Sequence, residues 1–221
     1  KTILLQNATQ LTDTLNNMTT DLNSLAGDID EKITEEISNI NDILKNINEL
    51  NTEIAAQLNS GVNGGNANDL EDERQRQVDA LAERFDLRIT DNTSNGALRI
   101  ITENGRTLVH EAGYGQLERT SGAPYEGIGY RSVNVNESLS NTLIPIDTDT
   151  LTSGSIKGLV DIRDDTITDL QAEIDTLANT IRTEVNAIHS RGTSFPAQNT
   201  LTSGNTSGAT SLTSDIFTEI D

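Results

Sequence analysis

Residues 11–47 read LTDTLNNMTTDLNSLAGDIDEKITEEISNINDILKNI, and this stretch carries the strongest structural signal in the chain. Apolar residues recur in it at steps of three and four, at Leu11, Leu15, Met18, Leu22, Leu25, Ile29, Ile33, Ile37, Ile40, Leu44 and Ile47. The same spacing continues to Ile54 and Leu58. Because this spacing of apolar residues is kept over many heptads, it predicts one long amphipathic helix. From Ile3 to Leu58 this helix would measure about 80 Å, which is typical of spacer and assembly proteins rather than of compact enzymes.

Two further helices are predicted, one directly after the first and one late in the chain. The first helix ends in the Gly- and Asn-rich turn 59–66, and Asp69 is the predicted N-cap of the second. The apolar row of the second helix comprises Leu70, Arg74, Val78, Leu81 and Phe85. This helix should run antiparallel to the first, because the connecting turn is short. Helical spacing returns from Ile156 to Ile188, so three apolar faces can bury one shared seam.

The region between these helices changes period and is predicted to be rich in strands. Predicted strands cover 87–90, 97–101, 107–109, 131–135 and 143–146. Asn95-Gly96 and Asn104-Gly105 lie between successive strands, which is a strong hairpin signal.

The predicted fold class is therefore α+β, an elongated antiparallel helical bundle with one very long helix and an inserted small β-rich domain. We predict that 1–87 and 151–191 form the two parts of the bundle domain and that 88–150 form the inserted β-rich domain. Residues 192–221 are predicted to be a linker or the start of a further domain, since they include a Thr-, Ser-, Gly- and Asn-rich tract. The chain begins at Lys1 inside the helical pattern, and we interpret it as a fragment.

The composition restricts the classes of partner. A formal charge of −20 argues against nucleic acid and against an anionic membrane surface, both of which need clustered Lys and Arg. The absence of cysteine excludes disulfides, thiolate metal sites and cysteine nucleophiles. Aromatic residues are only 3% of the chain, which favours thin aliphatic seams over a thick core. The expected partners are proteins.

One motif with catalytic chemistry begins at His110 but is incomplete. His110-Glu111-Ala112-Gly113-Tyr114 starts like the zinc-protease motif H-E-x-x-H, which needs two imidazoles one helical turn apart. Tyr114 occupies the second position, and the adjacent glycines disfavour a helix. We therefore predict a histidine at the end of a strand.

The other short motifs also favour ordinary loops. Gly113-Tyr114-Gly115 and Gly127-Ile128-Gly129 are interpreted as turns, because a dinucleotide loop needs a strand before it and a helix after it. Asp147-Thr148-Asp149 lacks the glycine and distal glutamate of a calcium loop and is interpreted as a solvated loop. The sequence predicts no catalytic residue, no metal site and no cofactor, and hence no enzyme.

Two arginines fall on apolar helical rows, Arg74 in the second helix and Arg163 in the third. A buried guanidinium needs acceptor partners. We hypothesise that at least one of them pairs across helices, with the candidate acids for Arg163 being Asp69, Asp72 and Glu73. In the alternative, both side chains pack along their stems while their charged ends reach water.

Three motifs carry a resemblance to a known family. The first is the helix around INDI at 40–43 and INELNTEI at 47–54, followed after the Gly/Asn-rich turn by a match to D-L-L-D-Q-R-D at Asp69, Leu70, Asp72 and Arg74. This stretch departs from the pattern at Glu71, Glu73 and Gln75. The second motif matches L-x-x-G-x-I-x-G-L-x-x-x-R-D at Leu151, Gly154, Ile156, Gly158, Leu159, Arg163 and Asp164. The third, N-x-x-H-x-x-G, falls at Asn186, His189 and Gly192. In this order the motifs resemble the family of flagellar hook-associated protein 1, the first hook–filament junction protein, without its terminal segments.

The resemblance implies a structural subunit of the bacterial flagellum. Such a subunit is exported unfolded through the flagellar apparatus without a cleaved signal peptide. Outside the cell it forms a layer that adapts a bendable hook to a stiffer filament. Its implied partners are neighbouring copies of itself, the hook protein and the next junction protein on the filament side, while this fragment alone should be monomeric. An exported coiled-coil adhesin or fibre-like protein with a β-rich recognition domain is the alternative, and a stable parallel trimer in ultracentrifugation would favour it.

Overall fold

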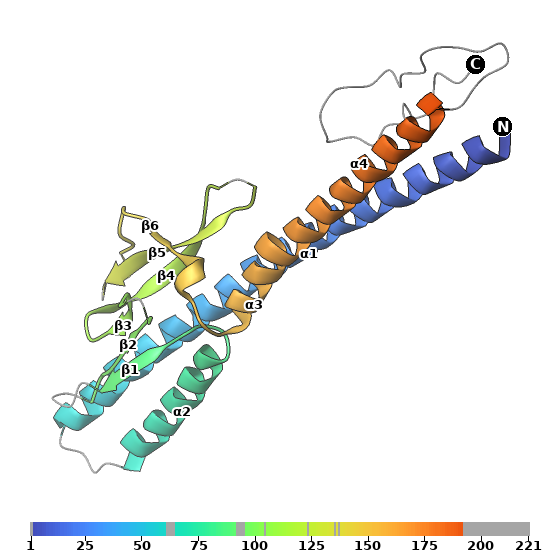
Figure 1. The fold of residues 1–221 in the computed structure, drawn as a ribbon. Coiled ribbons are helices and arrows are strands. Elements are labelled where there is room, and N and C mark those ends of the chain that lie inside the picture. Colours follow the sequence, from blue (N-terminus) through green and yellow to red (C-terminus); the bar gives the residue numbers. More distant parts are fainter. Residues whose placement is uncertain are drawn as a thin grey trace. The chain divides into compact units, whose positions relative to one another are not determined.

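The computed structural model describes residues 2–60, 65–91, 96–103, 105–122, 124–134, 136 and 138–191. The helical elements are α1 (Thr2–Ser60), α2 (Gly65–Ala82), the short 3-10 helix η1 (Thr148–Thr150), α3 (Ser155–Asp161), the π-helical segment η2 (Ile162–Thr166) and α4 (Ile167–Arg191). The strands are β1 (Arg88–Asp91), β2 (Leu98–Ile101), β3 (Thr107–His110), β4 (Gly113–Thr120), β5 (Gly127–Asn134) and β6 (Ile144–Ile146). Figure 1 shows that all six strands fall between α2 and α3 in the chain, which confirms an α+β fold.

The chain divides into two compact units, and α1 contributes to both. Unit 1 comprises 1–28 and 165–221, and unit 2 comprises 29–164. These limits differ from the predicted domain limits at 88 and 150. The two compact units consist of residues that lie close together in space. The predicted limits instead follow the positions where the spacing of apolar residues changes from helical to strand-like. The predicted domain assignment stays a prediction.

The predicted long helix is confirmed, because α1 continues for 59 residues. Its apolar row is fully buried within unit 2, at Ile33, Ile40, Leu44, Ile47 and Ile54. Other predicted seam positions are exposed by 41–51%, namely Leu11, Met18, Leu25 and Leu58. The predicted apolar row is therefore buried over much of α1 and left partly exposed at these four positions.

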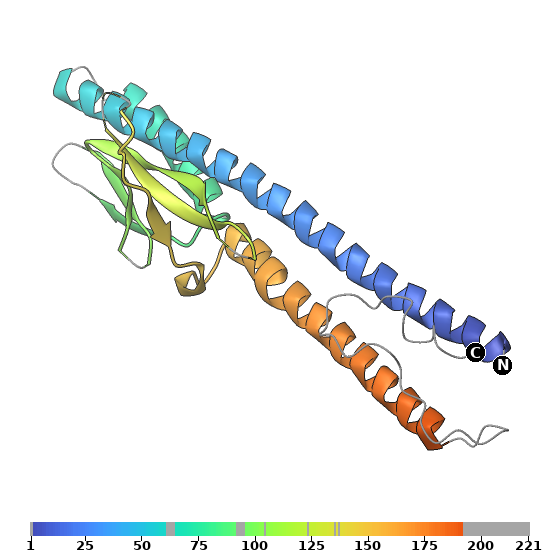
Figure 2. The same ribbon diagram turned by 90° about the horizontal axis from the view of Figure 1, so that it is seen from above.

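In unit 1, the first part of α1 packs against α4. Leu15, Ile174 and Ala178 form a small buried core, with Leu22 packed against it. Gln171 Nε2 donates to Asn23 Oδ1 at 2.9 Å. Sequence numbers rise along α1 as they fall along α4 between these contacts, so the two helices are antiparallel, as Figure 2 shows.

In unit 2, α2 runs antiparallel to the second half of α1. Arg74 contacts Asn51, whereas Arg84, just beyond α2, pairs with Glu36 at 3.2 Å. The predicted N-cap at Asp69 is wrong, because α2 begins at Gly65. An additional N-terminal turn forms there, and Ala67 in this turn is 5% exposed.

The strands form one antiparallel meander in the order β1-β2-β3-β4-β5-β6. The antiparallel pairs β1–β2 and β2–β3 confirm the two predicted hairpins. Gly96 and Gly105 have φ of +73° and +80°, as the glycine of such a connection requires. The longest pairing joins β4 to β5 over eight residue pairs, from Gly113↔Asn134 to Thr120↔Gly127. This strand β4 was not predicted from the sequence.

The two glycine motifs interpreted as turns lie inside strands, so that interpretation is wrong. A Cβ on Gly113 would lie 2.0 Å from the Val133 carbonyl oxygen, and one on Gly115 would lie 2.3 Å from the Tyr130 ring. These glycines therefore serve close packing in the β4–β5 pair. The second motif, 127–129, begins β5, which starts four residues before the strand predicted at 131–135.

The third predicted helix forms from Ser155 to Arg191, with one irregularity. The π-helical segment η2 separates α3 from α4, and periodicity alone did not predict it. None of the described helices is long and apolar enough to cross a membrane. The predicted linker at 192–221 lies outside the described residues.

Candidate functional site

Arg163 is the most buried charged residue in the described structure, with 2% exposure, and it lies within η2. Its Nε and Nη2 donate to the two carboxylate oxygens of Asp164 at 2.6 Å and 3.0 Å. Its Nη1 donates to Asp30 Oδ1 on α1. A buried guanidinium is tolerated when such charged acceptors surround it.

Asp30 also accepts a hydrogen bond from a second arginine, which lies in the sheet. Arg119 of β4 donates from Nη2 to Asp30 Oδ1 and from Nε to Glu126 Oε2 at 3.4 Å. The ring of Tyr125 lies 4.9 Å from Arg163 Cζ, which is cation–π distance. We call the set Asp30, Arg119, Tyr125, Arg163 and Asp164 the Arg163 node. It joins α1, the sheet and η2 within unit 2.

The hydrogen bonds of the Arg163 node keep the Arg163 guanidinium protonated although it is buried. Burial by itself lowers the pKa of the Arg163 guanidinium. The hydrogen bonds and charges of Asp164 and then of Asp30 outweigh that effect, so the pKa of Arg163 lies above its ordinary value. Arg163 is therefore a permanent cation, and the two carboxylates supply the compensating charge.

The prediction that at least one of the two arginines pairs across helices is confirmed by Arg163, but the three acids proposed for it are wrong. Asp69 and Asp72 are exposed on α2, and Glu73 bonds Arg76 and Gln77 of its own helix. Asp30 takes the role instead.

Arg74 is also held by protein acceptors, so the alternative in which both charged ends reach water is wrong. Its Nη1 donates to Asn51 Oδ1 at 2.8 Å and to the Gly96 carbonyl at 2.7 Å. These contacts connect α2 with α1 and with the turn before β2.

Two asparagines of α1 bind the backbone of the sheet, and sequence reasoning missed both. Asn51 donates to the Leu98 carbonyl at 2.8 Å and accepts from the Leu98 N–H at 2.9 Å. Asn41 makes the same pair of bonds to Leu117, at 2.9 Å and 2.7 Å. Each side-chain amide thus replaces a neighbouring strand at that position. A signal for Asn51 was present, because it stands at a seam position between Ile47 and Ile54.

The second predicted motif forms the joint between α2 and α3. The N–H groups of Ser155 and Ile156 donate to the carbonyls of Glu83 and Arg84 at 3.1 Å and 3.2 Å, so each helix end satisfies the other. Gly154 has φ +97°, and a Cβ there would lie 2.6 Å from the Arg84 carbonyl oxygen.

The remaining motif residues differ in burial. Ile156 is fully buried, Leu70 and Leu159 are half-buried, and Gly158 faces open space. The side chain of His189 lies outside the described residues.

Asp86 fixes the loop that leads into this joint. Its Oδ2 accepts from the Thr152 N–H at 2.9 Å and from Thr152 Oγ1 at 2.6 Å. The hydrogen bond from the Thr152 hydroxyl lowers the pKa of the Asp86 carboxyl. The backbone of Thr152 and the side chain of Ser153 add to this effect, against the opposing effect of burial.

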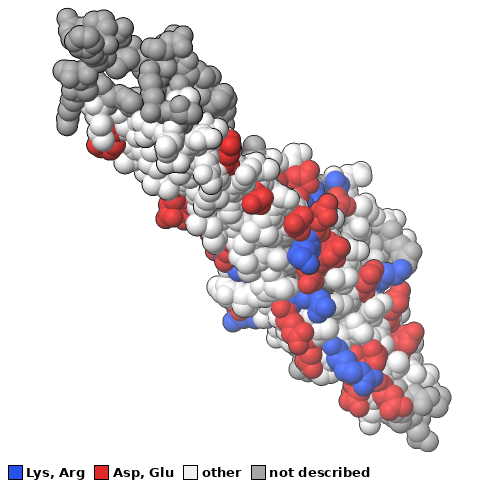
Figure 3. Space-filling view, turned by 90° about the vertical axis from the view of Figure 1, so that its right-hand side faces the viewer, with Lys and Arg blue, Asp and Glu red and all other residues white. Residues whose placement is uncertain are grey.

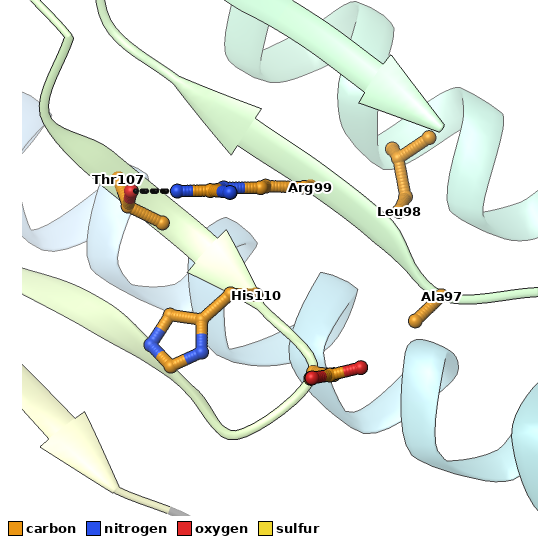
Figure 4. Close-up of a pocket in the computed structure, with 6 residues that line it drawn as sticks. Ala97, Leu98, Arg99, Thr107 and His110 are labelled. Atoms are coloured by element: carbon orange, nitrogen blue, oxygen red, sulfur yellow. Dashed lines mark hydrogen bonds between the residues drawn. The ribbon is translucent and has the colours of Figure 1, made fainter. Parts of the chain in front are cut away.

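A shallow pocket of about 330 Å³ lies beside His110 on the sheet (Figure 4). Arg99 Nη2 donates to Thr107 Oγ1 across it at 3.1 Å, and His110 Nδ1 accepts from the Ala112 N–H at 3.1 Å. His110 ends β3, which confirms the prediction of a strand-end histidine. In the part of the chain that the structure describes, no three His, Asp or Glu side chains are grouped to hold a metal ion.

Comparison with known proteins gives a family and a fold. A family model described as the helical domain of flagellar hook-associated protein FlgK matches residues 1–205. The fold is similar to the structure of the flagellar hook junction protein FlgK from Burkholderia pseudomallei, with a TM-score of 0.71 and 22% identity. That match covers 87% of this chain and 34% of the other, so this chain spans about a third of that protein's length. No curated protein matches the sequence.

Proposed function

We propose that this chain forms part of a structural subunit at the hook–filament junction. The chain belongs to the family of the flagellar hook-associated protein FlgK helical domain. The observation that carries this proposal is the family match over residues 1–205. In this role the protein adapts the hook to the filament. It carries no catalytic activity.

The internal contacts of unit 2 support a structural role. Buried polar groups are here used to fix one element to another, as in the Arg163 node and in the bonds from Asn41 and Asn51 to the sheet. Such bonds are costly to break inside a protein, because each leaves a buried group unpaired. A sheet tied in this way to a 59-residue helix suits a subunit that transmits force.

The proposed partners and location follow from the same role. The subunit would be exported through the flagellar apparatus and would assemble outside the cell. There it would contact copies of itself, the hook protein and the next junction protein. The strongly acidic balance of −20 is compatible with protein partners and unfavourable for nucleic acid.

Deleting the gene for the full-length protein tests the proposal. We expect cells that build hooks but carry no attached filament, with filament protein released into the medium, as seen by electron microscopy and immunoblotting. Reintroducing the gene should restore attached filaments. Normal filaments on the deletion strain would overturn the proposal.

A further inference from the structure

Two arginines of the sheet, Arg88 on β1 and Arg99 on β2, form no ion pair with an acid in the described part of the chain. The Arg99 guanidinium donates to the neutral hydroxyl of Thr107 instead. By contrast, Arg119 of β4 and Arg131 of β5 each pair with a carboxylate. On the face of the molecule that Figure 3 shows, most Lys and Arg side chains also lie next to Asp or Glu. A chain with 35 acids thus leaves two guanidinium groups of its sheet without a carboxylate.

These two arginines lie on the same face of the sheet. In the antiparallel register, Arg99 is opposite Thr90 and Arg88 is opposite Ile101, so the two arginines are diagonal neighbours. Diagonal neighbours in such a pair of strands are separated by roughly 7–8 Å. Both residues are exposed. Two like charges at this separation repel each other, and an anion bound to them removes that repulsion.

The pocket beside His110 supplies a further donor next to Arg99. Arg99, Thr107 and His110 all line this pocket of about 330 Å³. His110 Nδ1 accepts from the Ala112 N–H, which places the hydrogen of the neutral ring on Nε2. Figure 4 shows the Arg99 side chain extending from β2 to Thr107 on β3, with the His110 ring further along β3. Guanidinium and imidazole N–H groups are the donors that a carboxylate accepts from most strongly.

The acid Glu111 also lines the pocket and restricts the kind of anion that fits. Together, Arg88, Arg99 and Glu111 carry two positive charges and one negative charge, which leave one net positive charge. A compact dianion such as phosphate would be held close to Glu111, whereas two carboxylates at separate positions can each face one arginine. The overall charge of −20 further disfavours a nucleic acid strand.

We propose that this surface, formed by Arg88, Arg99 and the pocket beside His110, binds an extended acidic segment of a partner protein. In an extended chain, the side chains at positions i and i+2 point to the same side and are about 7 Å apart. That spacing matches the separation of the two arginines. The segment therefore carries Asp or Glu at i and i+2, with one carboxylate at Arg88 and the other in the pocket at Arg99. This inference goes beyond the flagellar role and does not depend on it.

The test uses the 221-residue chain labelled with ¹⁵N and three eight-residue, threonine-rich peptides. The first peptide has Glu at positions i and i+2, the second has Gln at both positions, and the third has two adjacent Glu residues. We expect the first to bind at least about fivefold more tightly than the second in an NMR titration, with the third in between. The amide signals of Arg99 and Thr107 should shift, and added salt should weaken the binding, because the charges are exposed.

Substitutions of single charges locate the binding. Arg88→Gln and Arg99→Gln should each weaken the first peptide about threefold, because each removes one charge pair. Lys32→Gln is the matched control, since it removes the same charge from an exposed position of α1. Glu111→Gln should strengthen the binding about twofold by removing a repulsion, whereas Glu35→Gln on the exposed face of α1 should not change it. Circular dichroism checks that each variant keeps the parent fold.

Several results would overturn the proposal. Equal binding of the first and second peptides would show that the surface does not recognise carboxylates, and equal binding of the first and third would remove the i, i+2 spacing. Binding of the first peptide that survives both arginine substitutions would place the site elsewhere. An oligothymidine of eight nucleotides that bound more tightly than the first peptide would make nucleic acid the ligand instead.

Discussion

Asp30 on α1 and Arg163 in η2 are joined by a hydrogen bond, although 133 positions separate them in the chain. Arg163 occupies the apolar row of the third helical stretch, between Val160 and Ile167, both of which are buried. The bond explains how a guanidinium can stand in that row, because a carboxylate of α1 meets it there. π-Helical turns often mark such specialised positions.

Removing the Asp30 carboxylate should therefore destabilise unit 2. Asp30→Ala leaves Asp164 as the remaining carboxylate on Arg163 and removes the half-buried Asp30 partner of Arg119. We expect the free energy of unfolding to fall by about 1–3 kcal/mol, because Nη1 of the buried Arg163 loses its charged acceptor. Urea unfolding followed by circular dichroism measures the change. Asp28→Ala, on the exposed surface two residues earlier, should change it by less than about 0.5 kcal/mol. Equal losses in the two variants would contradict the role given to Asp30.

Two glycines of one motif should respond to alanine in opposite directions. Gly154→Ala places a Cβ 2.6 Å from the Arg84 carbonyl oxygen at a residue with φ +97°. We expect a loss of about 2–3 kcal/mol in unfolding free energy, from strain and from separation of the two helix ends. Gly158→Ala lies in α3 with nothing within 4 Å of the new Cβ. It should add about 0.5–1 kcal/mol, because alanine favours helix. Thermal unfolding of both variants tests the pair, and a stable Gly154→Ala protein would refute the packing argument.

The features predicted correctly from the sequence are those encoded by neighbouring residues. The apolar spacing along α1 and the positive-φ glycines at 96 and 105 depend on a few adjacent positions. Strand β4 escaped prediction because its glycines resemble turn residues. Only the position of Val133 and Tyr130 on β5 shows why Gly113 and Gly115 are small.

The candidate site was predictable only in part, because its partners lie far apart in the chain. An arginine in an apolar row indicates that a buried acceptor is required, and this requirement pointed correctly to a partner on another helix. Which acid supplies it depends on how η2 meets α1, and sequence spacing does not determine that. The same holds for Asn41, whose partner Leu117 is 76 positions away.

Lowering the pH should destabilise the loop before α3, because the Asp86 carboxylate that holds this loop becomes protonated. Its pKa is depressed in the folded chain because it accepts hydrogen bonds from Thr152. The carboxylate therefore contributes stability above its ordinary pKa of 3.8, and this contribution is lost as the pH falls through the lower folded value. At pH 7, Asp86→Asn should cost about 1–3 kcal/mol of unfolding free energy. The difference between the variant and the parent chain should shrink below about pH 4. Urea titrations across the pH series measure it, and a constant difference would show that the Asp86 charge is not responsible.

The bonds from Asn51 to the sheet give the sharpest test of how α1 holds unit 2 together. Asn51 is 3% exposed and satisfies both backbone groups of Leu98, while its oxygen also accepts from Arg74. Asn51→Ala should lower the unfolding free energy by about 2–4 kcal/mol, because it leaves buried polar groups of the strand without partners. Asn46→Ala, on the exposed side of the same helix, should be neutral or slightly stabilising, since alanine is the better helix former.

Hydrogen exchange separates a local effect of Asn51 from a general one. The Leu98 amide should lose protection in Asn51→Ala, because its acceptor is the deleted side chain. The Leu117 N–H donates to Asn41 Oδ1 instead, so it should stay protected in Asn51→Ala. Asn51→Asp keeps the acceptor for the Leu98 N–H and loses only the donor to its carbonyl, so it should fall between the parent chain and Asn51→Ala. An unchanged Leu98 exchange rate in Asn51→Ala would mean that the strand end is held by other contacts.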